Sequence, residues 1–169
     1  MSEISEYKNI FYPTINNSAV VRAMLSGRVW EKKIVKIFNK YITKDDTVLD
    51  VGSYIGLHTI ELSKLANKVF SFEPVPLISN CVVKTLKKLN ITNVKHYNVG
   101  CGNHTGDNII YTNFDGDSSM AGIRDHKFGK AFECKIVLLD DVITEPIKLI
   151  KIDVEGSEWN VLAGAIRII

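Results

Sequence analysis

Features that mark membrane and secreted proteins are missing from this chain of 169 residues. No apolar run is long enough to span a bilayer. The N-terminal stretch, MSEISEYKNIFYPTINN, lacks the apolar core of a signal peptide. We therefore expect a cytoplasmic protein without membrane contacts.

Paired cysteines and an excess charge are missing as well. Cys81, Cys101 and Cys134 are an odd number and contain no C-x-x-C pair, so neither a disulfide framework nor a zinc site is expected. The net charge is only +2, whereas nucleic-acid binders usually carry a basic excess, so we expect no nucleic acid partner. No spacing of His, Asp and Glu indicates a metal site.

Hydrophobic residues make up 46% of the chain, enough for a packed core in one domain. Residues 1–19 are polar and irregular, and helical spacing follows over residues 19–41 with a break near Ser26-Gly27. Short apolar strands then alternate with helices, which predicts an α/β fold with a mostly parallel sheet and helices on both faces. The expected strands are residues 47–52, 68–73, 93–99, 108–114, 132–140 and 147–152, and the expected helices are residues 57–66, 76–90 and 157–169.

A glycine turn follows the first of these strands, in the run Asp50-Val-Gly52-Ser-Tyr-Ile-Gly56. A dinucleotide site would read G-x-G-x-x-G, but here Asp50 replaces the first glycine, and its carboxylate would repel a pyrophosphate. S-adenosylmethionine has no phosphate: its ammonium can pair with Asp50 and its carboxylate with the helix N-terminus near Gly56. A nicotinamide oxidoreductase is therefore the less favoured interpretation.

Further acidic residues end two other strands. Glu73 is placed to accept hydrogen bonds from two ribose hydroxyls. Asp153, with Glu155 in the next turn, lies where parallel sheets bind ligands. The alternatives are that these are ordinary turn acids, or that Asp153 and Glu155 cap the next helix or pair with Lys151. For Glu158, stabilisation of the helix dipole is as good an explanation as a functional role.

The segments "VLDVGSYIGLHTIELS", "VFSFEPVP", "LNITNV" and "LIKIDVEGSEWNVLAGA" resemble the FkbM family of class I S-adenosylmethionine-dependent methyltransferases. The resemblance runs from about Trp30 to the last residue, which predicts an N-terminal extension over residues 1–29 and a Rossmann-like methyltransferase domain over residues 30–169. It implies O-methylation of a hydroxyl group on a small molecule, sugar or glycan. It also implies a cofactor site made of Glu31, Asp50, Gly52, Ser53, Gly56, Glu73 and Pro74.

The resemblance further implies that Asp153 and Glu155 flank the site of methyl transfer, where a positioned base would accelerate the reaction. Lys151 is a third candidate, as a neutral base if it is buried or otherwise as a charge partner. His58 is expected to be a packed residue. His126, Ser118 and Ser119 lie in a long loop and either contact the acceptor or are solvated.

The family's fold continues with further strands beyond the segment that ends this chain. We therefore expect the strand at residues 147–152 to have an unpaired outer edge. A homodimer could cover that edge, or residues 1–29 could fold back over it. A non-catalytic module that binds an adenosyl group or a partner protein is the alternative function.

Overall fold

A parallel four-stranded sheet is the centre of this computed structural model, which describes residues 3–14, 18–112 and 130–169. The strands, in spatial order, are β5 (Val94–Tyr97), β4 (Lys68–Phe72), β3 (Thr47–Val51) and β9 (Leu149–Ile152). All neighbouring pairs are parallel. Val48, Leu49 and Val51 of β3 are buried, as expected for a parallel strand covered on both faces.

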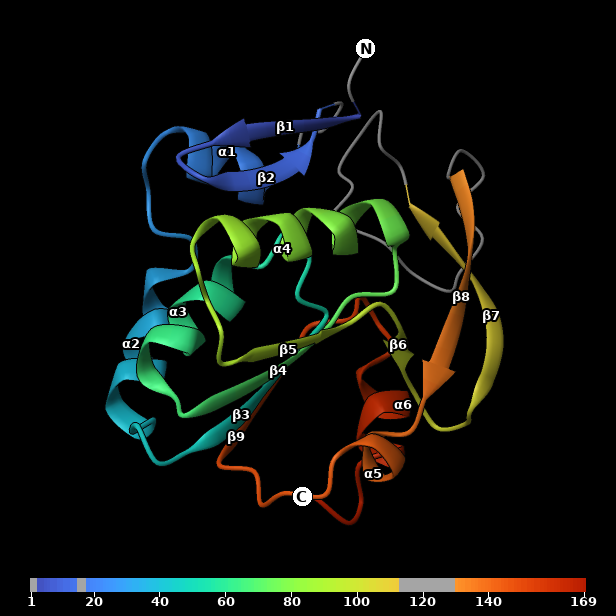
Figure 1. The fold of residues 1–169 in the computed structure, drawn as a ribbon. Helices are drawn as coiled ribbons and strands as arrows, with labels where there is room; N and C mark the ends of the chain where they lie inside the picture. The colour runs from blue at the N-terminus through green and yellow to red at the C-terminus, as the bar shows by residue number, and fades with distance from the viewer. Residues whose placement is uncertain (1–2, 15–17, 113–129) are drawn as a thin grey trace.

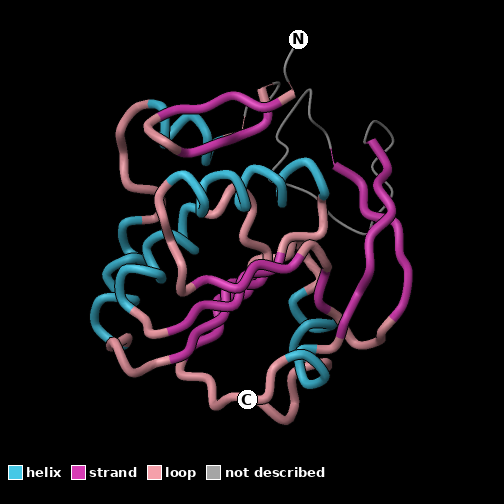
Figure 2. Tube along the Cα trace, in the orientation of Figure 1, coloured by secondary structure: helices cyan, strands magenta, loops and turns pink. Residues whose placement is uncertain are grey.

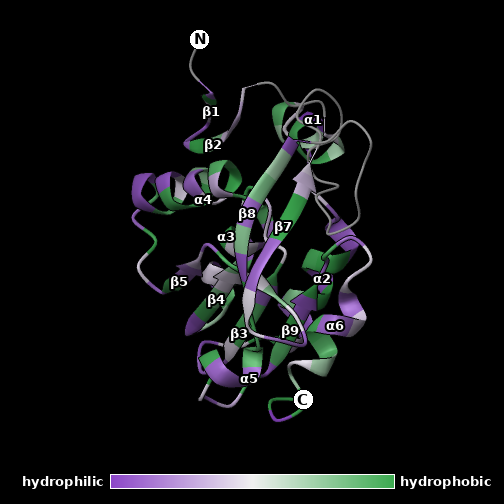
Figure 3. Cartoon of the chain, turned by 90° about the vertical axis from the view of Figure 1, so that its right-hand side faces the viewer, coloured by the Kyte–Doolittle hydropathy of each residue, from purple (hydrophilic) through white to green (hydrophobic). Residues whose placement is uncertain are grey.

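Helices cover both faces of the sheet (Figures 1 and 2). One face carries α2 (Lys32–Tyr41), α3 (Leu57–Leu65) and α4 (Pro76–Lys88), and the other carries α5 (Leu139–Val142) and α6 (Glu158–Ala163). Figure 3 shows hydrophilic and hydrophobic residues side by side along α4, as in an amphipathic helix that covers a sheet. Pro76 begins this helix, where a missing N–H costs nothing. The predicted α/β, Rossmann-like fold class is confirmed.

A second sheet lies beside the carboxyl ends of the first (Figure 1). Its order is β6 (Gly100–Cys101), β8 (Lys130–Val137) and β7 (Gly106–Thr112). β8 pairs parallel with β6 and antiparallel with β7. The sequence predicted the two longer strands, but the strand expected at residues 132–140 ends at Val137, and α5 follows.

The N-terminal residues do not match the expectation of an irregular segment. Among those described, β1 (Ile4–Tyr7) and β2 (Ile10–Pro13) form an antiparallel hairpin, followed by α1 (Ala19–Leu25). Lys8 and Asn9 at the turn both have positive φ, as in a two-residue hairpin turn, but Lys-Asn is not the usual sequence for one. The expected helix break is confirmed, with Gly27 at φ +72°.

The hairpin lies over α4 rather than over the outer edge of β9 (Figure 1). The backbone N–H of Phe11 donates to Thr85 Oγ1 at 2.9 Å. In the described part of the chain β9 pairs only with β3, so its outer edge has no partner strand there. Self-association through this edge stays a prediction.

No helix among the described residues is both long and apolar enough to cross a membrane.

Candidate functional site

A cavity of about 140 Å³ lies at the carboxyl ends of β3, β4 and β9. A single water needs only about 10–15 Å³, so the cavity has room for part of a ligand. Parallel α/β sheets bind ligands at this edge. The lining comes from residues 51–55, 57–58, 72–74, 99–101 and 153–155, together with Val20, Trp30, Ile78, Lys151, Ser157 and the β7–β8 residues Ile110, Cys134 and Ile136.

The glycine turn forms one wall of the cavity. Gly52 has φ +77°, and a Cβ atom placed on it would lie 1.9 Å from the backbone oxygen of Asp153. Only glycine therefore lets the ends of β3 and β9 approach this closely. The backbone N–H groups of Gly52 and Ser53 both donate to Phe72 O at 3.0 Å, which ties the turn to β4.

The Ser53 hydroxyl lines the cavity and is buried without a hydrogen-bond partner in the described part of the chain. A buried hydroxyl without a partner is costly, so this group indicates a ligand or an ordered water.

Glu73 is the buried carboxyl group of the site. Its Oε2 accepts from the N–H of Tyr54 at 3.0 Å, and its Oε1 accepts from the N–H of Val75 at 2.9 Å. Burial raises the pKa of Glu73 to about 7, against the opposing effect of these hydrogen bonds. A carboxylate has about four acceptor positions, so each oxygen keeps one for a ligand hydroxyl.

Asp50 and Lys151 form a buried ion pair behind the turn. Lys151 Nζ lies 3.3 Å from Asp50 Oδ1 and 3.5 Å from Asp153 Oδ2, and it donates to Gly52 O at 2.9 Å. Burial acts to lower the pKa of Lys151, but the two carboxylates outweigh burial and raise it above its ordinary value. Lys151 is therefore charged, which favours its role as a charge partner over that of a neutral base.

Asp50 has no exposed surface and does not line the cavity. Its Oδ2 accepts from Thr59 Oγ1 at 2.6 Å. The partners that the structure shows are thus Thr59 and Lys151, and pairing with a cofactor ammonium stays a prediction.

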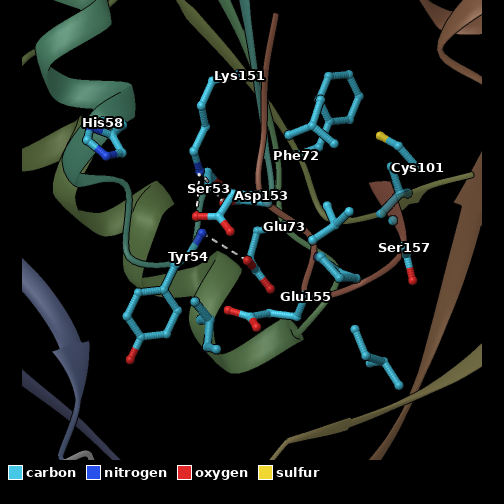
Figure 4. A pocket seen from close by; sticks show the side chains of 18 of the residues that line it. Ser53, Tyr54, His58, Phe72, Glu73, Cys101, Lys151, Asp153, Glu155 and Ser157 are labelled. Atoms are coloured by element: carbon cyan, nitrogen blue, oxygen red, sulfur yellow. Dashed lines mark hydrogen bonds and ion pairs between the residues drawn. The ribbon is translucent and has the colours of Figure 1, made fainter. Parts of the chain in front are cut away.

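Acidic side chains lie at the rim of the cavity. Figure 4 shows Glu73, Asp153 and Glu155 around one space, with Tyr54 beside it. The side chain of Asp153 is 57% exposed, so it is accessible to an acceptor. Glu158 accepts from the N–H groups of Val154 and Gly156, and backbone hydrogen bonds lower its pKa, which fits a role in holding the turn.

Two other predicted residues lie outside the lining. Glu31 has φ +43° at the start of α2, and its Oε2 is 2.8 Å from Nε2 of His58, which does line the cavity and packs edge-on against Phe38. Gly56 has φ +83° and begins α3. Pro74 lines the cavity, and its role in a cofactor site stays a prediction.

Ser118, Ser119 and His126, for which contact with the acceptor and solvation were left as alternatives, fall outside the described residues. Among those described, no group of three His, Cys, Asp or Glu side chains could hold a metal ion.

Two features of the site were not predicted from the sequence, namely the backbone N–H of Tyr54 and the apolar wall from β7 and β8. A backbone donor has no sequence signature. The wall depends on how the second sheet packs, although strands at residues 108–114 and 132–140 were predicted from the sequence.

A family model described as the methyltransferase FkbM domain matches residues 50–169. Among solved structures, methyltransferase FkbM from Methylobacillus flagellatus KT is 18% identical with a TM-score of 0.53, covering 89% of this chain and 39% of that chain. An rRNA methylase from Streptococcus thermophilus is 17% identical with a TM-score of 0.53, covering 80% of this chain and 60% of that chain. A methyltransferase candidate from Streptococcus mutans, in complex with SAH, is 26% identical with a TM-score of 0.40, covering 41% of this chain and 39% of that chain.

This chain therefore spans less than two thirds of the length of each of those structures. No curated protein matches it.

The resemblance to the FkbM family is confirmed by the family match. The expectation of no nucleic acid partner is wrong. An rRNA methylase shares this fold, so a net charge near zero is no ground for excluding a nucleic acid acceptor.

Proposed function

Because the chain belongs to the FkbM methyltransferase family, we propose that it transfers a methyl group from S-adenosylmethionine to a hydroxyl group. The observation that carries this proposal is the cavity at the carboxyl ends of the sheet, with Glu73 inside it and Asp153 and Glu155 at its rim.

The described residues fit the cofactor of this family, S-adenosylmethionine. Glu73 would accept the ribose hydroxyls with the acceptor positions that its backbone bonds leave free. The cofactor would give the buried Ser53 hydroxyl a hydrogen-bond partner. The close approach of the backbone at Gly52 would shape the turn around the cofactor. The apolar side chains of β7 and β8 offer a surface for the adenine ring. When bound, the cofactor supplies a methyl group on a positively charged sulfur.

The rim residues suit a hydroxyl acceptor. An alcohol must lose its proton as the methyl group arrives, and a positioned carboxylate can take that proton. We assign this role to Asp153 and Glu155. The Lys151 ammonium would hold Asp153 in place, since the two groups lie 3.5 Å apart. A sugar or glycan hydroxyl is the proposed acceptor.

The test has two stages. Calorimetric titration with S-adenosylhomocysteine and with NAD checks the cofactor: tighter binding of NAD would reject the assignment. Methyl transfer from labelled S-adenosylmethionine is then measured with monosaccharides, glycans and ribosomal RNA as acceptors. Transfer to a nitrogen, or to RNA alone, would reject the sugar hydroxyl. Binding without turnover on any acceptor would support the non-catalytic alternative.

The matched variants are Asp153→Asn and Glu155→Gln, at the rim. Each should keep its affinity for S-adenosylhomocysteine and lose turnover by about 10²–10⁴-fold if that residue is the base. Full turnover in both variants would show that the base lies elsewhere.

A further inference from the structure

A row of polar side chains crosses the parallel sheet at one register level. Lys151 in β9 is the register partner of Asp50 in β3, Asp50 is that of Ser71 in β4, and Ser71 is that of His96 in β5. Register partners on neighbouring strands place their side chains on the same face. The row therefore runs from Lys151, which lines the cavity, across the sheet to β5, the strand at the opposite edge from β9.

The helices over that face complete the row. Thr59 of α3 places Oγ1 2.6 Å from Asp50 Oδ2 and 3.2 Å from Ser71 Oγ. Ser71 Oγ is 3.0 Å from Nδ1 of His96, and Ser79 Oγ of α4 is 2.8 Å from Nε2. Thr59, Ser71 and Ser79 are all buried. The result is one continuous chain of hydrogen bonds from α4 to the ion pair.

The chemistry of the Asp50 carboxylate and of a neutral His96 ring sets the direction of every hydrogen bond in this chain. Asp50, paired with Lys151, can only accept, so Thr59 gives it its single proton. The contact between Thr59 and Ser71 must then use the Ser71 proton. The Ser71 oxygen is left to accept from His96 Nδ1–H. A neutral imidazole has one N–H, so Nε2 accepts from Ser79.

We propose that His96 is a positioning residue for the cofactor turn: as the Nδ1–H tautomer it completes a one-way hydrogen-bond chain that holds Asp50, and through it Lys151, in place. Lys151 in turn donates to Gly52 O inside the turn and lies beside Asp153. Hydrogen bonds that run in one direction polarise and strengthen one another. This inference rests on the proposed function, because it concerns the turn that would hold the cofactor.

Burial supports the neutral state of the ring. It lowers the pKa of His96 to about 4, and the more distant charge of Asp50 opposes this only in part. In the hydrogen bonds described above, the two ring nitrogens of His96 contact the hydroxyl groups of Ser71 and Ser79, and neither contacts a carboxylate.

The tautomer is tested on the full chain labelled with ¹⁵N-histidine, by nitrogen NMR near neutral pH. The ring of His96 is assigned by its loss in His96→Asn. We expect a protonated Nδ1 and an unprotonated Nε2. A protonated Nε2, alone or with Nδ1, would overturn the proposed direction of the chain. This readout involves no cofactor, so it is independent of the proposed function.

The positioning role is tested by titration with S-adenosylhomocysteine. His96→Leu removes both ring contacts, and we expect binding about tenfold weaker, the size of one net hydrogen bond. His96→Asn keeps a donor for Ser71 and should recover most of the affinity. Equal dissociation constants for wild type and His96→Leu would overturn the role.

Thr59→Val and Thr59→Ser give the same comparison if His96→Leu does not fold. Thr59→Val should weaken binding about tenfold, because it removes the bond to Asp50, and Thr59→Ser should bind as the wild type does. Failure of the wild type to bind S-adenosylhomocysteine would overturn the proposed function and the positioning role together, and the NMR result would still decide the hydrogen-bond direction.

Discussion

At the scale of single residues, the pKa of Glu73 predicts how ligand binding depends on pH. Burial raises this pKa to about 7, and ribose hydroxyls donate to the ionised form. Below pH 7 a proton must leave before the ligand binds, so affinity falls as the pH falls and levels off above the pKa. We expect about a tenfold loss in affinity for S-adenosylhomocysteine from pH 8 to pH 6, measured by calorimetric titration.

The control for this prediction is Glu73→Gln, which has no proton to lose. The affinity of this variant for S-adenosylhomocysteine should be lower at every pH. It should also lack the change in affinity between pH 6 and pH 8 that the titration of Glu73 causes in the wild type. The glutamine also turns an NH₂ group toward Tyr54 or Val75 N–H, so circular dichroism must confirm folding. The same pH dependence in both proteins would assign the titration to another group.

Gly52→Ala tests the close approach of β3 and β9. A left-handed φ costs an alanine about 1–2 kcal/mol, and at position 52 the added Cβ atom would also lie 1.9 Å from Asp153 O. Forcing an atom into packed structure costs a further amount of about 1–3 kcal/mol. We expect a loss of about 2–5 kcal/mol in the free energy of unfolding, together with loss of S-adenosylhomocysteine binding.

Gly27→Ala is the matched control. Gly27 has φ +72°, but nothing lies within 4 Å of the added Cβ. Only the backbone cost of about 1–2 kcal/mol applies there, and ligand binding should stay unchanged. Urea unfolding compares the two variants, and equal losses in both would mean that the contact with Asp153 is relieved easily.

At the scale of elements, polar contacts join the β1–β2 hairpin to α4. Phe11 N–H donates to Thr85 Oγ1 at 2.9 Å, and a Lys88–Glu6 ion pair at 3.6 Å lies at the surface. Surface pairs of this kind contribute little. Thr85→Val should therefore destabilise the docking by about 1–3 kcal/mol, because it leaves the Phe11 N–H without its acceptor.

Hydrogen exchange measures this effect locally. Amides of residues 4–13 should exchange faster in Thr85→Val, and those of β3 and β4 should not, since elements open independently of the core. Thr85→Ser keeps the acceptor and should exchange as the wild type does. Faster exchange throughout the sheet would show that the hairpin and the sheet open as one unit.

At the scale of the whole molecule, the Asp50–Lys151 pair lies in the parallel sheet, whose strands contribute residues to two of the apolar clusters, one on each face. Lys151→Met leaves the Asp50 carboxylate buried without its countercharge, which costs about 3–5 kcal/mol. This is a large share of a typical stability of about 5–15 kcal/mol. We expect a strongly reduced free energy of unfolding for this variant in urea.

The double variant Asp50→Asn/Lys151→Met removes both charges. It should recover most of the lost stability, because a neutral pair has no buried charge to compensate. A double variant that is no more stable than Lys151→Met would show that the loss comes from the contact of Lys151 with Gly52 rather than from charge.

Most of the fold and part of the site could be predicted from local sequence patterns. Short apolar strands alternating with helices indicated the parallel sheet, and its topology then brought Glu73, Asp153 and Glu155 to one edge. The turn after β3 was recognisable because Gly52 and Gly56 adopt positive φ angles that other residues avoid. These features depend on neighbouring residues and on rules common to all parallel sheets.

Long-range register and packing were not encoded in any local pattern. Lys151 and Asp50 are separated by most of the chain, and only the pairing of β9 with β3 makes them register partners. The same holds for Ser71 and His96, whose polar side chains looked unremarkable within their own strands. The side chain of Asp50 is turned from the cavity toward Thr59 because the register and α3 packing place a hydroxyl there. Contacts between distant segments depend on how the whole core packs, so only the folded chain reveals them.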